Sequence, residues 1–419
     1  MQPLLKWQAS SSMEPFVHDP LELGRGQIRL IEVLPSEQPH IRCRIRTFEQ
    51  SCCPEYVAVS YVWGDERDAR TITINGRSFL VKVNLHTFLR VVSSMLLKAC
   101  GQRRSVAPFL LPAAHLWIDQ LSIDQSRADE RNDQVRRMTE IFTQATAVIA
   151  WLGEGDATSD KAMKIIAEQS MNQEDSLTSQ SSAAANKARS KKYRRGMAVT
   201  PLFCRTYWTR LWIAQEFILP KNLFLVCGEL TITWTQLRSY YRSMLASSMS
   251  LEVFKEAEIF IIFRDGMHSM DGVVRTPKDP ERLDIALIWF THLDCKDPRD
   301  KVYGLLGLVR PGDRIHIDYK KEPSQIFWEV IRATNLGLGI CNTQFKLLGW
   351  SMGVTGNEQA AAACQTTFQY RSIFGTQKAC DVFSEAARLK WQTQSGSFIG
   401  SEKEIAQSLA RLELRVRPS

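Results

Sequence analysis

Apolar and polar stretches alternate along the first half of the chain and predict buried strands and amphipathic helices. Residues 56–63, YVAVSYVW, are β-branched and aromatic without charge, which is typical of a strand covered on both faces. Residues 83–96 and 127–145 carry apolar side chains at helical spacing. Two further apolar runs, 116–119 and 147–153, flank the second of these helices. Strand, helix and strand with short connections indicate a βαβ crossover and a parallel sheet.

Turn signals add hairpins to this sheet, and a helical pattern dominates the later part of the chain. Asn75-Gly76 lies between two short β-rich runs, and Gly228-Glu229 lies between two more in NLFLVCGELTITW. Residues 281–294, 297–308 and 323–336 have helical character. The chain therefore belongs to the α/β class, with an added hairpin and a mostly helical C-terminal part.

Charge and cysteine content bear on the compartment and the partners. The formal charge is +8, and six of these charges lie in residues 187–195, KARSKKYRR. Such a run can act as a nuclear address or contact RNA, but its Ser-, Gln- and Ala-rich flanks favour a solvated linker, so nucleic acid is not the expected partner.

Ten cysteines without a CxxC pair indicate reduced thiols. No signal peptide and no spanning run are evident, so we expect no membrane insertion and a cytoplasmic location, with nuclear entry through residues 187–195 left open.

Several common catalytic motifs are excluded. GWSMG at 349–353 matches the G-x-S-x-G nucleophile elbow, but the last histidine, His316, precedes Ser351, whereas that fold needs its histidine after the serine. No Rossmann G-x-G-x-x-G and no P-loop is present, and the seven histidines form no metal-ligand spacing. We therefore expect no metal and no bound cofactor.

Polar residues at the ends of apolar strands form the remaining constellation. They are Ser60, Trp63, Gly64 and Asp65 after the first strand, Asp119 and Gln120 with Asp124 and Gln125 after the second, and Trp212 with Glu216 in LWIAQEF. The carboxyl ends of parallel strands form the crevice in which open α/β sheets bind ligands. Glu216 is a carboxylate inside an otherwise apolar run, and we expect it to face a hollow shared with these strand ends.

Four blocks of the sequence, in order, resemble the signature blocks of the fungal heterokaryon incompatibility (HET) domain. They are YVAVSYVWGD, LWIDQLSIDQSRADERNDQVRRMTEIFTQATAVIAWLGE, RTYWTRLWIAQE and DPRDKVYGLLGL, and the leader IRLIEVLPSEQPHIRCRI is also similar. Together they cover about residues 28–335. The second block departs from the family pattern, since it has SIDQ where CINQ is usual, which weakens any thiol mechanism.

The resemblance implies a fungal protein of non-self recognition and programmed cell death, with a TIR/flavodoxin-like parallel sheet flanked by helices. Some TIR domains cleave NAD with a glutamate in a W-x-x-x-E arrangement, and Trp212 to Glu216 has this spacing. Glu216 is then the catalytic candidate, and Ser60, Trp63, Gly64, Asp119 and Trp212 are the ligand-binding candidates. A fixed carboxylate stabilises the positive charge that develops on the ribose, and a tryptophan can stack on the pyridinium ring.

Structural interpretations compete with each of these roles. Glu216 can pair with Arg205 or Arg210 and act as a brace, and a tryptophan is more often core than ligand platform. Asp119 can cap the turn before the long helix. The charged residues of ADER, 128–131, are expected to form surface ion pairs.

Three functions remain open from the sequence. The first is hydrolysis of NAD at the nicotinamide N-glycosidic bond, with NAD as substrate. The second is a non-enzymatic signalling module, for which we expect self-association or an unidentified protein partner. The third is an accessory protein or enzyme of a fungal secondary-metabolite pathway, which rests on fold analogy alone.

The length of 419 residues and the changes in composition suggest four parts. We predict an N-terminal leader at 1–50 that packs on the domain, a HET domain at 51–230 with an insertion or linker at 154–200, a helical extension at 231–345, and a poorly defined tail at 346–419.

Overall fold

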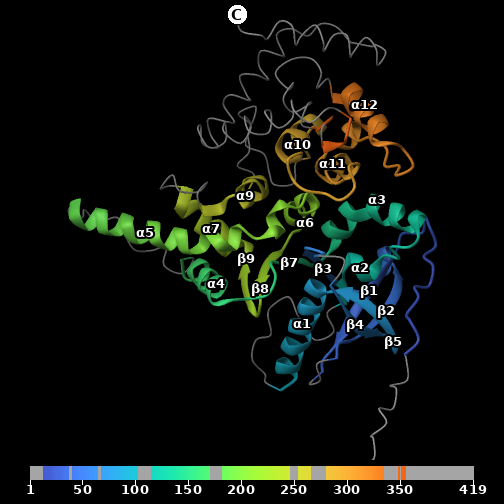
Figure 1. Cartoon of the computed structure of the whole chain (residues 1–419), viewed down its shortest axis with the longest axis horizontal. Helices are drawn as coiled ribbons and strands as arrows, with labels where there is room; N and C mark the ends of the chain where they lie inside the picture. The colour runs from blue at the N-terminus through green and yellow to red at the C-terminus, as the bar shows by residue number, and fades with distance from the viewer. Residues whose placement is uncertain are drawn as a thin grey trace, which may run out of the picture. The chain divides into compact units, whose positions relative to one another are not determined.

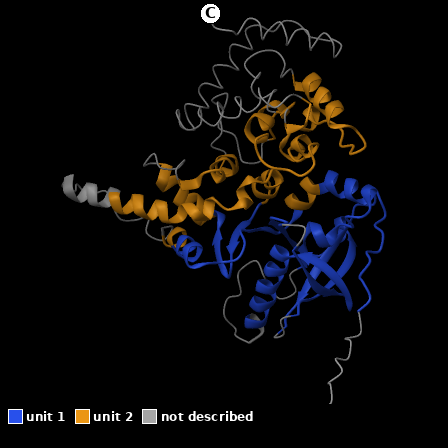
Figure 2. Cartoon of the chain, in the orientation of Figure 1, with its two compact units in different colours: residues 1–137, 144–164, 221–234 blue, residues 138–143, 165–220, 235–419 orange. Residues whose placement is uncertain are grey.

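Two compact units make up the chain, and each is assembled from separate stretches of sequence (Figure 2). The computed structural model describes residues 13–36, 40–64, 68–101, 115–169, 182–245, 253–265, 280–334, 348–349 and 351–354. The first unit comprises residues 1–137, 144–164 and 221–234, and the second comprises 138–143, 165–220 and 235–419. The domain limits proposed from the sequence stay predictions.

A single mixed sheet forms the first unit, and in the described residues it has nine strands in the order β5-β4-β2-β1-β6-β3-β7-β8-β9 (Figure 1). Strands β6, β3, β7 and β8 run parallel to one another, whereas β1 is antiparallel to both of its neighbours. The strands are β1 (Gln27–Leu34), β2 (Arg42–Glu49), β3 (Tyr56–Tyr61), β4 (Ala69–Ile74), β5 (Arg77–Lys82), β6 (His115–Trp117), β7 (Ala147–Trp151), β8 (Leu223–Cys227) and β9 (Leu230–Thr233).

The four parallel strands confirm the α/β class expected from the sequence. Taken in chain order, β3, β6, β7 and β8 lie in the spatial order 2-1-3-4, which is that of flavodoxin-like sheets. The chain leaves β3 toward β6 on one side and leaves β7 toward β8 on the other. A topological switch point therefore lies between β3 and β7.

Burial on both faces explains why these strands read as apolar runs. Every residue of β3 and of β7 is buried, and the two strands pair from Val57↔Ala147 to Tyr61↔Trp151. Helix α1 (Val83–Gly101) packs its apolar stripe, Leu85, Phe88, Leu89 and Val92, into the same core cluster as β1, β3 and β7. The crossover from β6 to β7 contains α2 (Asp119–Ser122) and α3 (Ala128–Gln144).

Both predicted hairpins are present. β4 and β5 pair antiparallel around Asn75 and Gly76, whose φ angles of 50° and 82° are those of a type I′ turn. β8 and β9 pair antiparallel around Gly228, where φ is 55°. A Cβ at Gly228 would lie 3.0 Å from the backbone of Gly155, so this position favours glycine in two ways.

The leader forms two central strands of the sheet. β1 pairs along its whole length with β2 and contacts β6 through Ile31↔Leu116. Strand β1 is mostly buried, whereas on β2 the buried residues are Cys43 and Ile45, so the alternating pattern of β2 is short.

The second unit is helical in its described residues. Helix α4 (Ala157–Gln169) begins in the first unit and ends in the second. The other helices are α5 (Ser182–Phe203), α6 (Ile213–Ile218), α7 (Trp234–Leu245), α9 (Ala257–Asp265), α10 (Leu283–Phe290), α11 (Asp300–Tyr303) and α12 (Pro323–Thr334), with 3-10 turns at Thr206–Thr209, Leu306–Leu308 and Pro311–Asp313. The predicted helical C-terminal part is thereby confirmed.

Helix α5 differs from the sequence expectation at 154–200. The Ser- and Gln-rich composition suggested a linker with helix only around DKAMKIIAEQ, but Ser182–Phe203 is one helix. Alanine, lysine and arginine are strong helix formers, and they dominate residues 183–195. Across the described part of the chain, no helix combines the length and the apolar character that crossing a bilayer requires.

Candidate functional site

A cavity of about 270 Å³ lies at the switch point of the parallel sheet. Its lining residues are Gly64, Asp68, Val83, Asn84, Thr87 and Glu154. Gly64 follows the end of β3 by three residues, and Glu154 follows the end of β7 by three residues. The remaining residues belong to the first turns of α1 or precede it. Because ligands of open α/β sheets bind at such carboxyl ends, this cavity is the candidate binding site of the first unit.

Asn84 fixes the geometry of the cavity. Its Nδ2 donates to the carbonyl of Val62 at 2.6 Å, and its Oδ1 accepts from Trp151 Nε1 at 2.9 Å. One side chain at the amino end of α1 thus joins the chain segments that leave β3 and β7. The amino end of a helix also favours negatively charged groups, because the helix dipole is positive there.

Carboxylates give the cavity its charge. Glu154 Oε1 accepts from Arg90 Nη2 at 2.9 Å, and both side chains are largely exposed. Asp68 reaches the cavity from the start of the β4 hairpin. Carboxylate oxygens bind ribose hydroxyls by charge-assisted hydrogen bonds, so the lining suits a polar, hydroxylated ligand.

Trp63 and Asp119, which were predicted to bind ligand together, contact each other directly. Trp63 Nε1 donates to Asp119 Oδ2 at 2.6 Å, and Lys82 Nζ lies 5.1 Å from the centroid of the Trp63 ring. Asp119 is the first residue of α2, and its Oδ1 accepts from the amide of Gln120 at 2.7 Å. The interaction ties the end of β3 to the end of β6, and a lysine already covers a face of the ring.

The remaining candidates of the first unit differ in access. Ser60 is buried within β3, opposite Ala150 of β7. Gly64 has a φ of 78° and lines the cavity itself. Asp65 lies outside the described residues. Of the strand-end candidates that the structure describes, Gly64 is therefore the one placed directly at the cavity.

Trp212 and Glu216 belong to the second unit. Glu216 lies on α6 and is only 3% exposed, and its Oε2 is 3.6 Å from Nη1 of Arg210. This is one of the two arginines that the sequence suggested as its partner. The separation exceeds that of a charge-assisted hydrogen bond, which is about 2.7–2.9 Å. A crevice shared by Glu216 and the strand ends of the first unit stays a prediction.

Asp300 is a second buried carboxylate near Trp212. Its Oδ2 accepts from Trp212 Nε1 at 3.1 Å, and its Oδ1 accepts from the hydroxyl of Tyr319 at 2.5 Å. Burial raises the pKa of Asp300 to about 6, although these two hydrogen bonds oppose the rise. From its sequence pattern this residue was expected only to start a helix, and its buried position at the start of α11 is what shifts its pKa.

Close packing joins the third and fourth sequence blocks inside the second unit. Gln215 Nε2 donates to the carbonyl of Gly304 at 2.8 Å, and its Oε1 accepts from Thr139 at 3.0 Å. A Cβ at Gly307 would lie 2.2 Å from Gln215 Oε1, so the glycine leaves room for that side chain. The block YGLLGL therefore acts as the surface on which α6 packs.

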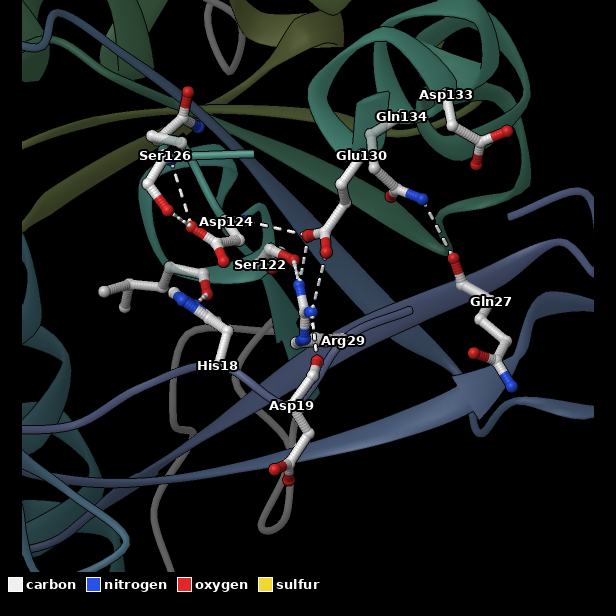
Figure 3. Close-up of polar contacts among 12 residues, drawn as sticks. His18, Asp19, Gln27, Arg29, Ser122, Asp124, Ser126, Glu130, Asp133 and Gln134 are labelled. Carbon is white, nitrogen blue, oxygen red and sulfur yellow. Dashed lines mark hydrogen bonds and ion pairs between the residues drawn. The ribbon is translucent and has the colours of Figure 1, made fainter. Parts of the chain in front are cut away.

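A buried ion pair that the sequence did not indicate joins the leader to the second block. Arg29 of β1 binds Glu130 of α3 through two bonds, Nη1 to Oε1 at 2.5 Å and Nη2 to Oε2 at 3.0 Å (Figure 3). Arg29 also donates to the carbonyls of Ser122 and Asp19, and Glu130 accepts from the amide of Asp124 at 2.8 Å. The prediction of a surface pair in ADER is wrong for Glu130, which is 1% exposed.

Electrostatics explain why this buried carboxylate stays ionised. Burial alone would raise the pKa of Glu130, but hydrogen bonds from Arg29 and from the Asp124 amide hold the pKa below its ordinary value. The pair anchors the segment that carries Asp124 and Ser122 to the sheet (Figure 3). Its role is structural.

Sequence reasoning missed the residues that line the cavity beside Gly64. Asn84 follows the predicted hairpin at the start of a helix, and Glu154 follows a strand that ends in glycine. Both positions obey the strand-end rule that selected Trp63 and Asp119, and the rule applied to every parallel strand and to the next helix would have found them.

Comparison with known proteins agrees with the blocks. The family model "Heterokaryon incompatibility protein (HET)" matches residues 56–216. The chain is 28% identical, over 358 residues, to "Heterokaryon incompatibility protein 6, OR allele" of Neurospora crassa, with 73% of this chain and 51% of the relative covered. The chain thus spans about half the length of the curated relative it matches. No solved structure matches.

The matched region begins at the first residue of β3 and ends at Glu216. It includes the parallel strands β3, β6 and β7, the strand-end residues and α6 up to the predicted carboxylate. Residues 56–216 therefore carry a HET domain, and the chain is similar to a heterokaryon incompatibility protein.

Proposed function

We propose that this protein acts in a fungal non-self recognition and cell-death response by hydrolysing NAD at the nicotinamide N-glycosidic bond. The observation that carries the proposal is the cavity between the ends of β3 and β7, at the switch point of a flavodoxin-like strand order. The family match and the name of the relative support the biological setting.

The cavity suits part of a dinucleotide. Its volume of about 270 Å³ lies just below the usual range of small-molecule pockets, so it accommodates one half of NAD. Glu154 and Asp68 offer acceptors to ribose hydroxyls, and the first turn of α1 offers the positive end of a helix dipole to the pyrophosphate.

The reaction needs only water as a second reactant. The bond between ribose C1′ and the pyridinium nitrogen breaks, and its electron pair neutralises the ring. Water then adds to C1′ and releases a proton, so that the products are nicotinamide and ADP-ribose. Since positive charge develops on the ribose, a fixed carboxylate lowers the barrier, and Glu216 is the catalytic candidate.

Burial of Glu216 supports this assignment. Its side chain lies on α6 and is only 3% exposed, and electrostatic stabilisation is strongest where water is excluded.

Release of nicotinamide from NAD by the purified full chain tests the proposal. We expect Glu216→Gln to lower kcat by at least about a hundredfold, because an electrostatic transition-state contact is lost. Glu154→Gln should instead raise KM, since it removes a ligand contact. Glu22→Gln, an exposed carboxylate paired with Arg25 on the surface, is the control.

Two results would remove parts of the proposal. Equal turnover by the wild type and by Glu216→Gln would exclude Glu216 as the catalytic group. Absence of nicotinamide release from any form, under conditions in which the chain is folded, would exclude the enzyme.

A second candidate function is a non-enzymatic signalling module, and the contacts of α6 favour it. The pairs Arg210–Glu216, Trp212–Asp300 and Gln215–Gly304 describe α6 as a structural brace. For such a module we expect self-association or capture of a protein partner. Light scattering of the purified chain checks this expectation, and a strict monomer that hydrolyses NAD would contradict it.

A further inference from the structure

The net charge of the protein is concentrated around helix α5. Between Asp175 and Glu216 the chain has no acidic residue, and it has eight basic ones, Lys187, Arg189, Lys191, Lys192, Arg194, Arg195, Arg205 and Arg210. Removing these eight from the 53 lysines and arginines leaves 45, which equals the number of aspartates and glutamates. The remainder of the chain is therefore formally neutral.

One face of α5 combines exposed apolar and basic side chains. Tyr193, Met197 and Pro201 are exposed and follow one another at intervals of four residues, so they form a stripe along the helix. Tyr193 is 48% exposed and Met197 is 39% exposed, and they are among the few large apolar side chains with this property in the described residues. Lys191 and Arg194 are exposed and continue along one edge of the stripe, since Lys191, Arg194 and Met197 follow one another at intervals of three residues. We call these five residues the α5 face.

The other basic side chains of this turn of the helix are engaged within the second unit. Lys192 donates to the carbonyl of Ser243, and Arg195 pairs with Glu168 at 3.4 Å. Val199, Leu202 and Phe203 are buried on the inner side. Lys191 and Arg194 have no ion-pair partner within the part of the chain that the structure describes, so their charges are available to an external anion.

We propose that the α5 face docks on the surface of a bilayer that contains anionic lipids. Basic side chains attract lipid phosphates, and a neighbouring apolar stripe enters the boundary between headgroups and acyl chains. A nucleic acid would also use the two cations, but its phosphate backbone offers nothing to Met197 and Pro201. The apolar stripe therefore favours the lipid surface.

The inference concerns a surface and is independent of NAD hydrolysis. The α5 face and the cavity of the first unit have no residue in common. Failure of either proposal therefore does not affect the other. The consequence of docking would be to concentrate the protein at a negatively charged membrane.

Co-sedimentation of the full chain with vesicles tests the inference. We expect binding to vesicles of phosphatidylcholine mixed with phosphatidylserine, no binding to phosphatidylcholine alone, and weaker binding as salt is raised. Lys191→Glu combined with Arg194→Glu should weaken binding at least about tenfold.

Helix α4 provides a matched control. Lys161 and Lys164 are exposed and have the same spacing of three residues, so Lys161→Glu combined with Lys164→Glu changes the charge equally at another place. This variant should keep most of the binding. Tyr193→Ser combined with Met197→Ser leaves the charge unaltered and should also weaken vesicle binding about tenfold, because the inserted apolar area is lost.

Three outcomes would overturn the inference. They are absence of binding to the anionic vesicles, equal loss in the α4 and α5 charge variants, and unchanged vesicle binding after both apolar side chains are replaced. Displacement of the protein from vesicles by a short RNA, with the Tyr193 and Met197 variant still bound to that RNA, would assign the surface to nucleic acid instead. Circular dichroism shows whether each variant retains its helix content.

Discussion

Two arginine–glutamate pairs with buried carboxylates, one in each compact unit, contain the same charges in different geometry. Arg29 and Glu130 form two bonds to each other, and carbonyl and amide groups around them add further hydrogen bonds. Arg210 and Glu216 approach each other at 3.6 Å, and the side chain of Arg210 is 18% exposed. The first pair has the geometry of a fixed structural link, whereas the second holds a buried carboxylate at a longer distance.

The difference between the two pairs shows that burial of a glutamate does not reveal its role. Both glutamates are almost inaccessible, so burial by itself does not distinguish a structural carboxylate from a catalytic candidate. Bidentate bonding to an arginine and a lowered pKa identify Glu130 as a permanently ionised anchor. The longer contact of Glu216 is compatible with a change of partner during a reaction.

Loss of the tight pair should have the largest effect. Glu130→Gln leaves Arg29 buried without its counter-ion, and we expect the free energy of unfolding to fall by about 3–5 kcal/mol. Urea denaturation measures it. The matched control is Glu22→Gln in the exposed Arg25–Glu22 pair, for which we expect a change of less than about 1 kcal/mol. Equal effects in the two variants would break the comparison.

Asp300 extends the comparison to a buried carboxylate whose hydrogen-bond donors are Trp212 and Tyr319. Its pKa is raised from 3.8 to about 6, so the folded state binds a proton that the unfolded state lacks between these values. The contribution of this group to the free energy of unfolding is therefore fully present below about pH 4. About 3 kcal/mol of it is lost as the pH rises through about 6. Asp300→Asn should remove this dependence. Thermal unfolding of both forms from pH 4 to 7 measures it, and a constant difference between them would contradict the assignment.

Packing against α6 should have an intermediate effect. Gly307→Ala places a methyl group where Gln215 and Thr139 lie, and we expect a loss of about 1–3 kcal/mol in the free energy of unfolding. Gly312→Ala, where nothing lies within 4 Å, is the control and should be nearly neutral. A neutral Gly307→Ala would show that α6 does not depend on this contact.

Replacement of Glu216 should have the smallest effect on stability. Glu216→Gln keeps the size of the side chain and gives up a 3.6 Å ion pair, for which we expect a cost of about 1 kcal/mol. Measured beside Glu130→Gln, it sharpens the contrast between the pairs. A loss as large as that of Glu130→Gln would favour the brace over the catalyst.

The predicted elements succeeded where a local pattern decides the structure. β3 and β7 read as uncharged apolar runs, α1 and α3 show a helical stripe, and Asn75-Gly76 has the residues that its turn requires. Helix α5 was missed because flanking composition outweighed residue propensity. β1 and β2 were assigned to a leader. Their place in the sheet depends on the pairing of β1 with β6, and these two strands are more than eighty residues apart in the sequence.

The candidate site divides in the same way. The sequence alone indicated the HET domain, through four blocks in order, and it selected Trp63, Gly64 and Asp119 from their positions after predicted strands. Only the tertiary structure decided that Trp63 and Asp119 bind each other, that Asn84 and Glu154 complete a cavity, and that Asp300 meets Trp212. Local pattern fixes which residues form a strand or a helix, because backbone geometry and burial act over a few residues. Contacts between side chains far apart in sequence depend on how those elements pack, and packing is a property of the whole fold.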